Sequence, residues 1–273
     1  MLQVAFIIAN APCPPNSLIP VCLEKILGDA ILLWQIHALP AEVEHICVIT
    51  GNDHEKIARF IDDLKSKNDI SDNVECCQSS NAVRSILDLS ATIGIAPTSR
   101  VLLLMPAQPL ISPSALKELA SDTGALVSAE QSDNLPGPIS LHCAELQSAI
   151  KQLVQQTAEP SWDDLLKHIS KTIQLKTLKC DREDLLHAQT RHNLSEIQSI
   201  ARSRILNHWL CSGVVFMDSA SAIVGPRVEL AGRGVIIEPQ VRLEGKITVG
   251  EGSTIGQGSV IKNSLLGANV EIR

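Results

Sequence analysis

The sequence lacks clustered basic residues. Its 273 residues include 23 Lys and Arg against 30 Asp and Glu, which gives a formal net charge of −7, and no basic run occurs. Binding to nucleic-acid phosphates needs clustered Lys and Arg, so this balance argues against a nucleic-acid partner. Apolar residues make up 45% of the chain, which suits a soluble globular protein with a substantial core.

Residues 1–23 carry no charged side chain, yet they lack the features of a membrane anchor or a secretory signal. Four prolines would interrupt a spanning helix, and the basic start of a signal peptide is missing. We therefore expect a buried strand at residues 4–9 that runs into a loop, no membrane segment, and a cytoplasmic protein. The prolines are Pro12, Pro14, Pro15 and Pro20.

No C-x-x-C pair occurs among the eight cysteines, so the usual spacing of zinc ligands is absent. In a reducing compartment such residues serve as small buried hydrophobes, which is the interpretation we favour. The adjacent Cys76 and Cys77 leave a redox-active pair open. On a strand, however, one of two neighbours faces the core, which favours a structural role.

Short β-branched runs alternate with amphipathic stretches over the first half of the chain. This alternation predicts βαβ units and a mostly parallel, doubly wound sheet. Residues 143–210 are expected to be mainly helical. We expect strands at 4–8, 45–50, 100–104, 124–129 and 138–142, and helices at 28–39, 53–66, 80–92 and 112–121.

The last expected helix separates two domains. Asn193 stands three residues before Glu196, which is the spacing of a capping box, and Gly213 ends the helical pattern. We therefore predict a first domain at 1–192, a linker helix at 193–213 and a second domain at 214–273.

A six-residue period dominates the second domain. Leu243, Val249, Ile255 and Ile261 follow one another at this step, and glycines come directly after two of them. The pattern is typical of a parallel β-helix, in which each aliphatic side chain points inward and stacks on the next coil. An antiparallel meander is the alternative, and the strict register argues against it. About three turns are expected, and the pattern still runs at 271–273, where we expect a partner or cap to cover the open end.

The order of an α/β domain, a long helix and a hexapeptide β-helix resembles the N-acetylglucosamine-1-phosphate uridyltransferase/glucosamine-1-phosphate acetyltransferase family (GlmU-like). Residues 202–218, 235–238, 243–245 and 261–264 read much like that family. The resemblance implies an α/β fold, with a Rossmann-like nucleotidyltransferase domain followed by a short left-handed parallel β-helix. It also implies UDP-N-acetylglucosamine as the related product, and a homotrimer formed through the β-helix.

The phosphate-binding loop of that family has lost its charged residues here. Family members carry L-A-A-G-x-G-T-R-M-x-S-x-L-P-K-x-L, and residues 7–23 align with this motif without a gap. The motif's glycines let backbone N–H groups approach the triphosphate, while its Arg and Lys neutralise it. Asn10 and Pro12 replace the two glycines. Pro14 replaces the Arg and Val21 replaces the Lys, so we predict that this loop no longer cradles phosphate.

The metal-binding motif of the family has lost its carboxylate. Its Y-G-D-x-P-L sequence carries the aspartate that holds magnesium, and Ala107 stands at that position within residues 105–110. The partner ligand, an Asn in the family, corresponds to Gln189, which alone would not hold magnesium. In residues 74–82, which match the uracil-reading segment, the base-reading Gln corresponds to Cys76.

We interpret the chain as a UDP-N-acetylglucosamine pyrophosphorylase-related protein that is non-catalytic: a scaffold, a partner subunit or a nucleotide-sugar sensor. No catalytic residue, metal site or cofactor is expected. The alternative is an active sugar-1-phosphate nucleotidyltransferase with magnesium and a replacement phosphate clamp, for which Lys25 and Arg84 are candidates. Acetyltransferase activity is not expected, because no His follows His208. By resemblance, the candidate substrate-binding positions are Ala9, Asn10, Ala11, Gln78, Ala107, Gln108 and Gln189.

Two further clusters have simple explanations. His187 and His192 lie five apart, off a shared helical face and without a third ligand, which favours solvated surface residues over a metal site. Asp163 and Asp164 look like a carboxylate pair, but the negative first turn of a helix explains them better.

Overall fold

The computed structural model describes residues 3–9, 19–128 and 137–273. The chain divides into two compact units: the first is Met1–Glu24 with Ile31–Thr190, and the second is Lys25–Ala30 with Arg191–Arg273. Within the described ranges, no helix combines the length and the apolar character that crossing a bilayer would require.

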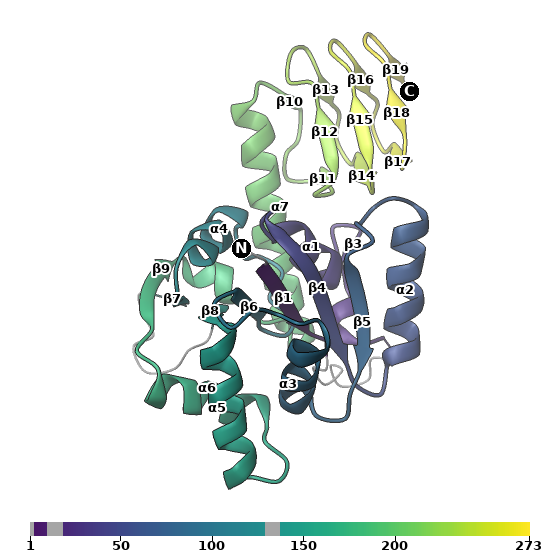
Figure 1. Cartoon of the computed structure of the whole chain (residues 1–273). Helices are drawn as coiled ribbons and strands as arrows, with labels where there is room; N and C mark the ends of the chain where they lie inside the picture. Colours follow the sequence, from purple (N-terminus) through teal and green to yellow (C-terminus); the bar gives the residue numbers. More distant parts are fainter. Residues whose placement is uncertain (1–2, 10–18, 129–136) are drawn as a thin grey trace. The chain divides into compact units, whose positions relative to one another are not determined.

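The first unit is built on a seven-stranded sheet with the order β5-β4-β1-β6-β8-β7-β9 (Figure 1). The first four strands of that order run parallel, β8 is antiparallel to both of its neighbours, and β9 is parallel to β7. The strands are β1 (Gln3–Ile8), β4 (Val43–Thr50), β5 (Val74–Gln78), β6 (Arg100–Leu104), β7 (Gly124–Ser128), β8 (Ile139–His142) and β9 (Lys176–Cys180). The predicted α/β class is confirmed, whereas β9 was missed within a region expected to be helical.

Helices cover both faces of this sheet. Alternate residues of β1 enter two cores, with Ala5 and Ile7 on one face and Val4, Phe6 and Ile8 on the other. Helices α1, α2 and α4 pack into the first core, and α3, α5 and α6 into the second. Their bounds are α1 (Ile31–Ala38), α2 (His54–Ser66), α3 (Ala82–Thr92), α4 (Pro113–Ser121), α5 (Cys143–Gln156) and α6 (Trp162–Thr172). This layering is the doubly wound arrangement that alternating strands and helices predict.

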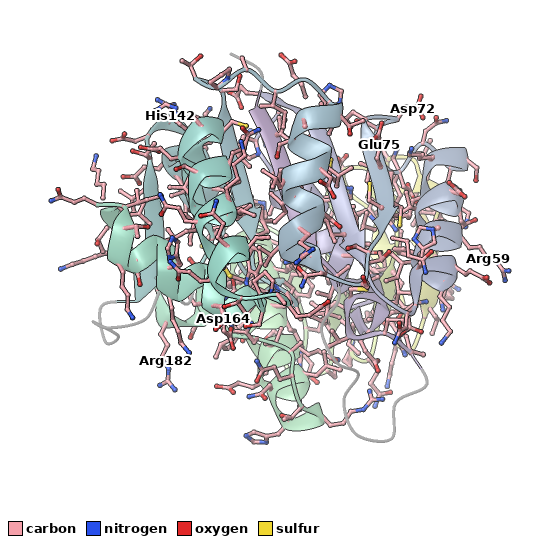
Figure 2. All side chains as sticks on the ribbon, turned by 60° about the horizontal axis from the view of Figure 1, so that its bottom comes forward. Arg59, Asp72, Glu75, His142, Asp164 and Arg182 are labelled. Carbon is pink, nitrogen blue, oxygen red and sulfur yellow. The ribbon has the colours of Figure 1, made fainter. Side chains whose placement is uncertain are left out.

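Helix α6 explains the acidic pair that follows Trp162. Ser161 is its N-cap, and the carboxylate of Asp164, which is labelled in Figure 2, accepts hydrogen bonds from the Ser161 N–H (3.0 Å) and hydroxyl (2.6 Å). The hydroxyl bond, followed by the backbone bond, holds the pKa of Asp164 below its ordinary value. The interpretation of these acids as the first turn of a helix is confirmed.

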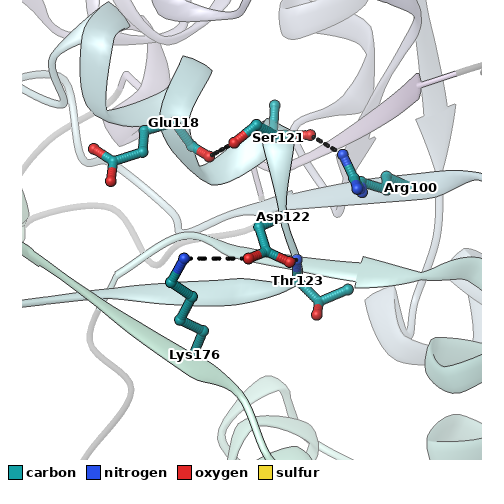
Figure 3. Close-up of polar contacts among 7 residues, drawn as sticks. Arg100, Glu118, Ser121, Asp122, Thr123 and Lys176 are labelled. Carbon is teal, nitrogen blue, oxygen red and sulfur yellow. Dashed lines mark hydrogen bonds and ion pairs between the residues drawn. The ribbon is translucent and has the colours of Figure 1, made fainter.

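Charged groups at the amino edge of the sheet pair with one another. Lys176 Nζ lies 3.3 Å from Asp122 Oδ2, the Thr123 N–H donates to Asp122 Oδ1 (2.8 Å), and Arg100 Nη1 donates to the carbonyl of Ala120 (3.0 Å) (Figure 3). The Thr123 N–H and then the Lys176 ammonium lower the pKa of Asp122. The Lys176–Asp122 pair is exposed, so we treat it as a surface ion pair of small energetic weight.

Residues 191–273 of the second unit form helix α7 (Arg191–Cys211) and three stacks of short parallel strands. The period-six residues Leu243, Val249 and Ile255 have no exposed surface, and Ile261 is 9% exposed. The parallel β-helix predicted from that period is confirmed (Figure 1). The stacks are β10 (Val215–Phe216), β13 (Ile236–Ile237), β16 (Thr254–Ile255) and β19 (Glu271–Ile272); β11 (Ile223–Val224), β14 (Arg242–Glu244) and β17 (Val260–Lys262); and β12 (Val228–Leu230), β15 (Ile247–Val249) and β18 (Leu265–Leu266).

The side chain of Arg202 connects helix α7 to the first coil of the β-helix. Arg202 donates to the carbonyl oxygens of Ala222 (2.9 Å), Ser219 (2.7 Å) and Ala220. The helix begins at Arg191, two residues earlier than predicted, so Asn193 lies inside its first turn and is not the N-cap. The capping-box prediction was therefore wrong, although the helix itself was predicted correctly.

Candidate functional site

The strand order of the first unit defines where a ligand would bind. From β1 the chain builds outward through β4 and β5, and then returns to place β6 on the other side of β1 (Figure 1). In open α/β sheets, ligands bind outside the carboxyl ends of the strands where the order reverses. Ala9, Ala107 and Gln108 follow β1 and β6 at this point, whereas Gln78 ends β5, two strands away from β1.

Two of the predicted positions, Asn10 and Ala11, lie outside the described residues, as do Pro12 and Pro14. The predicted loss of the phosphate cradle therefore stays a prediction for that part of the loop. Val21, which stands where the family has its Lys, belongs to a short 3-10 helix (Val21–Leu23) and is 2% exposed. A buried valine offers no positive charge to a phosphate.

Ala107 presents a buried methyl group at the position of the metal-binding aspartate. It is 3% exposed and has a left-handed backbone with φ of 54°. Residues other than Gly pay about 1 kcal/mol or more for this conformation, so surrounding contacts must hold it. One such contact is the hydrogen bond that the Ala188 N–H donates to the Ala107 carbonyl (2.9 Å).

Gln108 and His187 join the two segments that carry metal ligands in the family. Gln108 has no exposed surface, and its Nε2 lies 3.0 Å from the Leu185 carbonyl and 2.9 Å from His187 Nε2. His187 Nδ1 lies 3.0 Å from the Pro106 carbonyl. Because a carbonyl accepts, Nδ1 carries the proton, and Nε2 accepts from the Gln108 amide. We call the hydrogen bonds among Pro106–Gln108 and Leu185–Ala188 the clasp.

The clasp corrects the interpretation of His187 as a solvated surface residue. The side chain is half-buried, and both of its ring nitrogens are engaged. His192, in contrast, is exposed in the first turn of α7. Sequence spacing could not reveal the contact, because His187 meets Pro106 and Gln108 about 80 residues away in the chain.

The residues at this edge do not fit a magnesium ion. Magnesium prefers carboxylate and phosphate oxygens in near-octahedral geometry. Ala107 supplies none, and the Gln189 side chain is exposed, with its backbone N–H bonded to the His187 carbonyl (2.9 Å). Among the described residues, no group of three or more His, Cys, Asp or Glu is arranged to hold a metal.

Comparison with known proteins agrees with this fold. No family model matches the sequence. The bifunctional protein GlmU of Acaryochloris marina is 41% identical over 92 residues, which are 34% of this chain and 20% of that protein. GlmU of Synechococcus sp. (strain JA-2-3B'a(2-13)) is 30% identical over 138 residues, which are 50% of this chain and 21% of that protein.

The chain is a partial relative of GlmU. It spans about one fifth of the length of the curated relatives that it matches. A solved structure, 4-diphosphocytidyl-2C-methyl-D-erythritol synthase from Anaerococcus prevotii, superposes with a TM-score of 0.54 at 13% identity and covers 74% of this chain and 96% of that chain. At this identity the match shows the nucleotidyltransferase fold alone. The chain is thus similar to GlmU over part of its length, and it shares the fold of that solved structure.

The segment that matches the uracil-reading motif of GlmU-like proteins carries no Lys or Arg and is partly packed. Cys76 packs against the core on the α2 side, and its Sγ lies 3.6 Å from His54 Nδ1. Burial raises the pKa of the Cys76 thiol to about 11. Burial likewise raises the pKa of Cys47 on the adjacent strand to about 12. Protonated thiols are poor nucleophiles, so the structural interpretation of the Cys76–Cys77 pair is supported.

The two cations proposed for a replacement clamp do not share a compact unit. Lys25 clusters with the second unit, whereas Arg84 belongs to α3 of the first. The Arg84 guanidinium donates to the carbonyl of Ala158, in the connection between α5 and α6. The Arg84 side chain is thus engaged within the first unit.

A polar residue that the motif comparison missed also shapes this edge. Gln35 is 2% exposed in α1, and its Nε2 donates to the Met105 carbonyl (2.9 Å) at the end of β6. A signal for it exists in the sequence, because Gln35 is an amide within the otherwise mainly apolar run of α1. Buried polar side chains are retained where they hold a hydrogen bond.

Proposed function

We propose that this protein is a non-catalytic relative of UDP-N-acetylglucosamine pyrophosphorylases, a pseudoenzyme that acts as a scaffold, a partner subunit or a nucleotide-sugar sensor. The clasp carries this proposal. Where GlmU-like proteins would join two segments through a magnesium ion, this chain joins them through Gln108, His187 and the backbone bond from Ala188 to Ala107.

The size of the lost stabilisation supports the proposal. Nucleotidyl transfer relies on cations and metal ions that neutralise developing charge. Removing one such group costs about 3 kcal/mol, or roughly a hundredfold to a thousandfold in rate. Val21 and Ala107 each represent one such loss at a described and buried position. Two independent losses correspond to a deficit of at least about ten-thousandfold.

Uridylyl transfer is therefore expected to fall at least about ten-thousandfold below that of GlmU measured in parallel. The assay follows pyrophosphate release from UTP and N-acetylglucosamine-1-phosphate, with and without magnesium. Calorimetric titration with UDP-N-acetylglucosamine then separates the sensor from the scaffold. Micromolar binding without turnover supports a sensor, and no binding at millimolar ligand supports a scaffold or partner subunit.

One variant tests the competing activity. If Arg84 is part of a replacement clamp, Arg84→Gln abolishes a measurable, magnesium-dependent transfer. Saturable transfer in the natural protein that disappears in Arg84→Gln would refute the non-catalytic proposal. Lys117→Gln, which removes a positive charge elsewhere in the first unit, serves as the control for non-specific loss of charge.

We also propose a cytoplasmic homotrimer that assembles through the β-helix. Among the described cysteines, Cys47, Cys76, Cys77, Cys143 and Cys211 are free thiols, which suits a reducing compartment. Exposed apolar side chains on the β-helix suit burial against other copies. Light scattering is expected to give about 88 kDa, three times the 29.4 kDa of the chain, and a monomeric mass argues against the trimer. The exposed residues are Val215, Met217, Val260 and Leu265.

A further inference from the structure

The Lys25–Ala30 segment forms a hairpin that clusters with the second unit, although it lies inside the first in sequence. Its two strands are β2 (Lys25–Ile26) and β3 (Asp29–Ala30), joined by a two-residue turn at Leu27 and Gly28. Both turn residues have positive φ, 50° and 97°. This is the geometry of a tight hairpin whose turn matches the twist of its strands. The sequence pattern predicted the start of a helix here instead.

A buried ion pair holds the hairpin on the β-helix. Arg227 Nε and Nη2 each lie 2.8 Å from one carboxylate oxygen of Asp29. The side chains are 16% and 4% exposed, respectively. A bidentate pair of this kind combines direction with strength. The ion pair therefore fixes the position of the hairpin against the β-helix within the second unit.

Close packing around the turn of the hairpin further restricts its position. A Cβ on Gly28 would lie 3.2 Å from the Cβ of Glu244, and one on Gly225 would lie 3.0 Å from the Leu27 carbonyl. Burial alone would raise the pKa of Glu244, but hydrogen bonds and charge from Lys262 and Arg242 outweigh it and lower that pKa. Leu27 itself is 4% exposed. The turn of the hairpin thus packs against backbone atoms and the ion-paired carboxylate of Glu244, which leaves it little room to move.

The two ends of the hairpin run directly into elements of the candidate site. On one side is the short helix Val21–Leu23, which carries the position of the family's lysine. On the other is α1, whose Gln35 holds the end of β6. The Ile31 N–H donates to the Glu24 carbonyl (3.0 Å), so a backbone hydrogen bond closes the neck of the hairpin.

We propose that Asp29 and Arg227 are positioning residues, through which the β-helix restrains the segments 19–24 and 31–36 beside the candidate site. The pair acts along the hairpin, and no contact of either residue with a ligand is required. Assembly or partner binding at the β-helix would then change the freedom of those segments. This inference uses the location of the candidate site, and it stands whether or not that site binds a nucleotide sugar.

Hydrogen–deuterium exchange on the full-length protein tests this coupling. In Asp29→Asn, which keeps the shape of the side chain, the amides of Leu23, Glu24 and Ile31 are expected to exchange at least tenfold faster. The amides of α5 are expected to keep their rates. Arg227→Met is expected to give the same pattern with a larger change. Arg233→Met, at an exposed arginine of the same β-helix, is the matched control and is expected to change nothing.

Two results would overturn the proposal. If the faster exchange is confined to residues 25–30 and the β-helix, the ion pair holds the hairpin in place without restraining the neighbouring segments. If α5 accelerates as much as Leu23 and Ile31, the pair serves global stability and not positioning. Failure of the non-catalytic proposal has a different signature, because it appears as transfer activity in the natural protein and leaves the exchange pattern intact.

Discussion

Replacing Gly250 with alanine is expected to destabilise the β-helix by about 2–3 kcal/mol, the scale of overpacking in a closely packed core. Gly250 follows the inward-facing Val249, and its N–H donates to the Leu266 carbonyl of the next coil (3.0 Å). A Cβ at this position would lie 2.5 Å from the carbonyl carbon of Gly267 and 2.6 Å from the nitrogen of Ala268. Both atoms belong to backbone, so the coils themselves must separate.

Gly267→Ala is the matched control for that prediction. Gly267 follows Leu266 as Gly250 follows Val249, but a Cβ there meets no described atom within 4 Å. Its effect is expected to stay within about 0.5 kcal/mol, as for ordinary surface substitutions. Amide exchange at Thr248 and Thr254, measured against urea, reports on the second unit alone. Equal effects of the two variants would show that close stacking of the coils does not limit stability.

The regular period of the sequence explains why the β-helix could be predicted. In a β-helix, the inward-facing residues that stack on one another are separated by a constant number of residues. The six-residue spacing therefore predicts the stacking positions of Leu243, Val249, Ile255 and Ile261 directly from the sequence. The sheet of the first unit could be predicted in a similar way. Its central strands are continuous apolar runs, as parallel strands buried on both faces require.

The elements that the sequence did not reveal depend on partners far away in the chain. Strand β9 has mostly exposed side chains, two of them lysines, and pairs only with β7 among the described strands, so it carries little apolar signal. The hairpin at Lys25–Ala30 has strands of two residues each, and Arg227, almost 200 residues away, helps to hold it. Local propensity contains no information about such contacts, which tertiary packing decides.

The candidate site likewise has features that the sequence predicted and contacts that only the structure shows. Motif alignment singled out Ala107 and Gln108, and the structure places both directly after β6 at the carboxyl end of the parallel strands. It assigned Gln108 to substrate binding, and that assignment stays a prediction. The structure adds that the Gln108 amide bonds to Leu185 and His187. Sequence comparison can show that a metal ligand is missing, but what replaces its connection is a matter of three-dimensional contact.

Gln108→Ala is expected to destabilise the first unit by about 3 kcal/mol. The substitution leaves the Leu185 carbonyl and His187 Nε2 without the amide that now bonds to both, and an unsatisfied buried group costs about 1–3 kcal/mol. It also opens a cavity, because the side chain has no exposed surface. Gln189→Ala, at an exposed glutamine two residues after His187, is the matched control and is expected to stay within about 0.5 kcal/mol.

Urea unfolding of both variants measures this difference, and nitrogen NMR of the imidazole groups identifies its cause. In the natural protein, His187 is expected to carry its proton on Nδ1, because that atom faces the Pro106 carbonyl. In Gln108→Ala the donor to Nε2 is gone, so the proton is expected to redistribute between the two nitrogens. An unchanged NMR pattern together with unchanged stability would mean that the clasp holds nothing in place. The proposal that it substitutes for a metal bridge would then lose its physical basis.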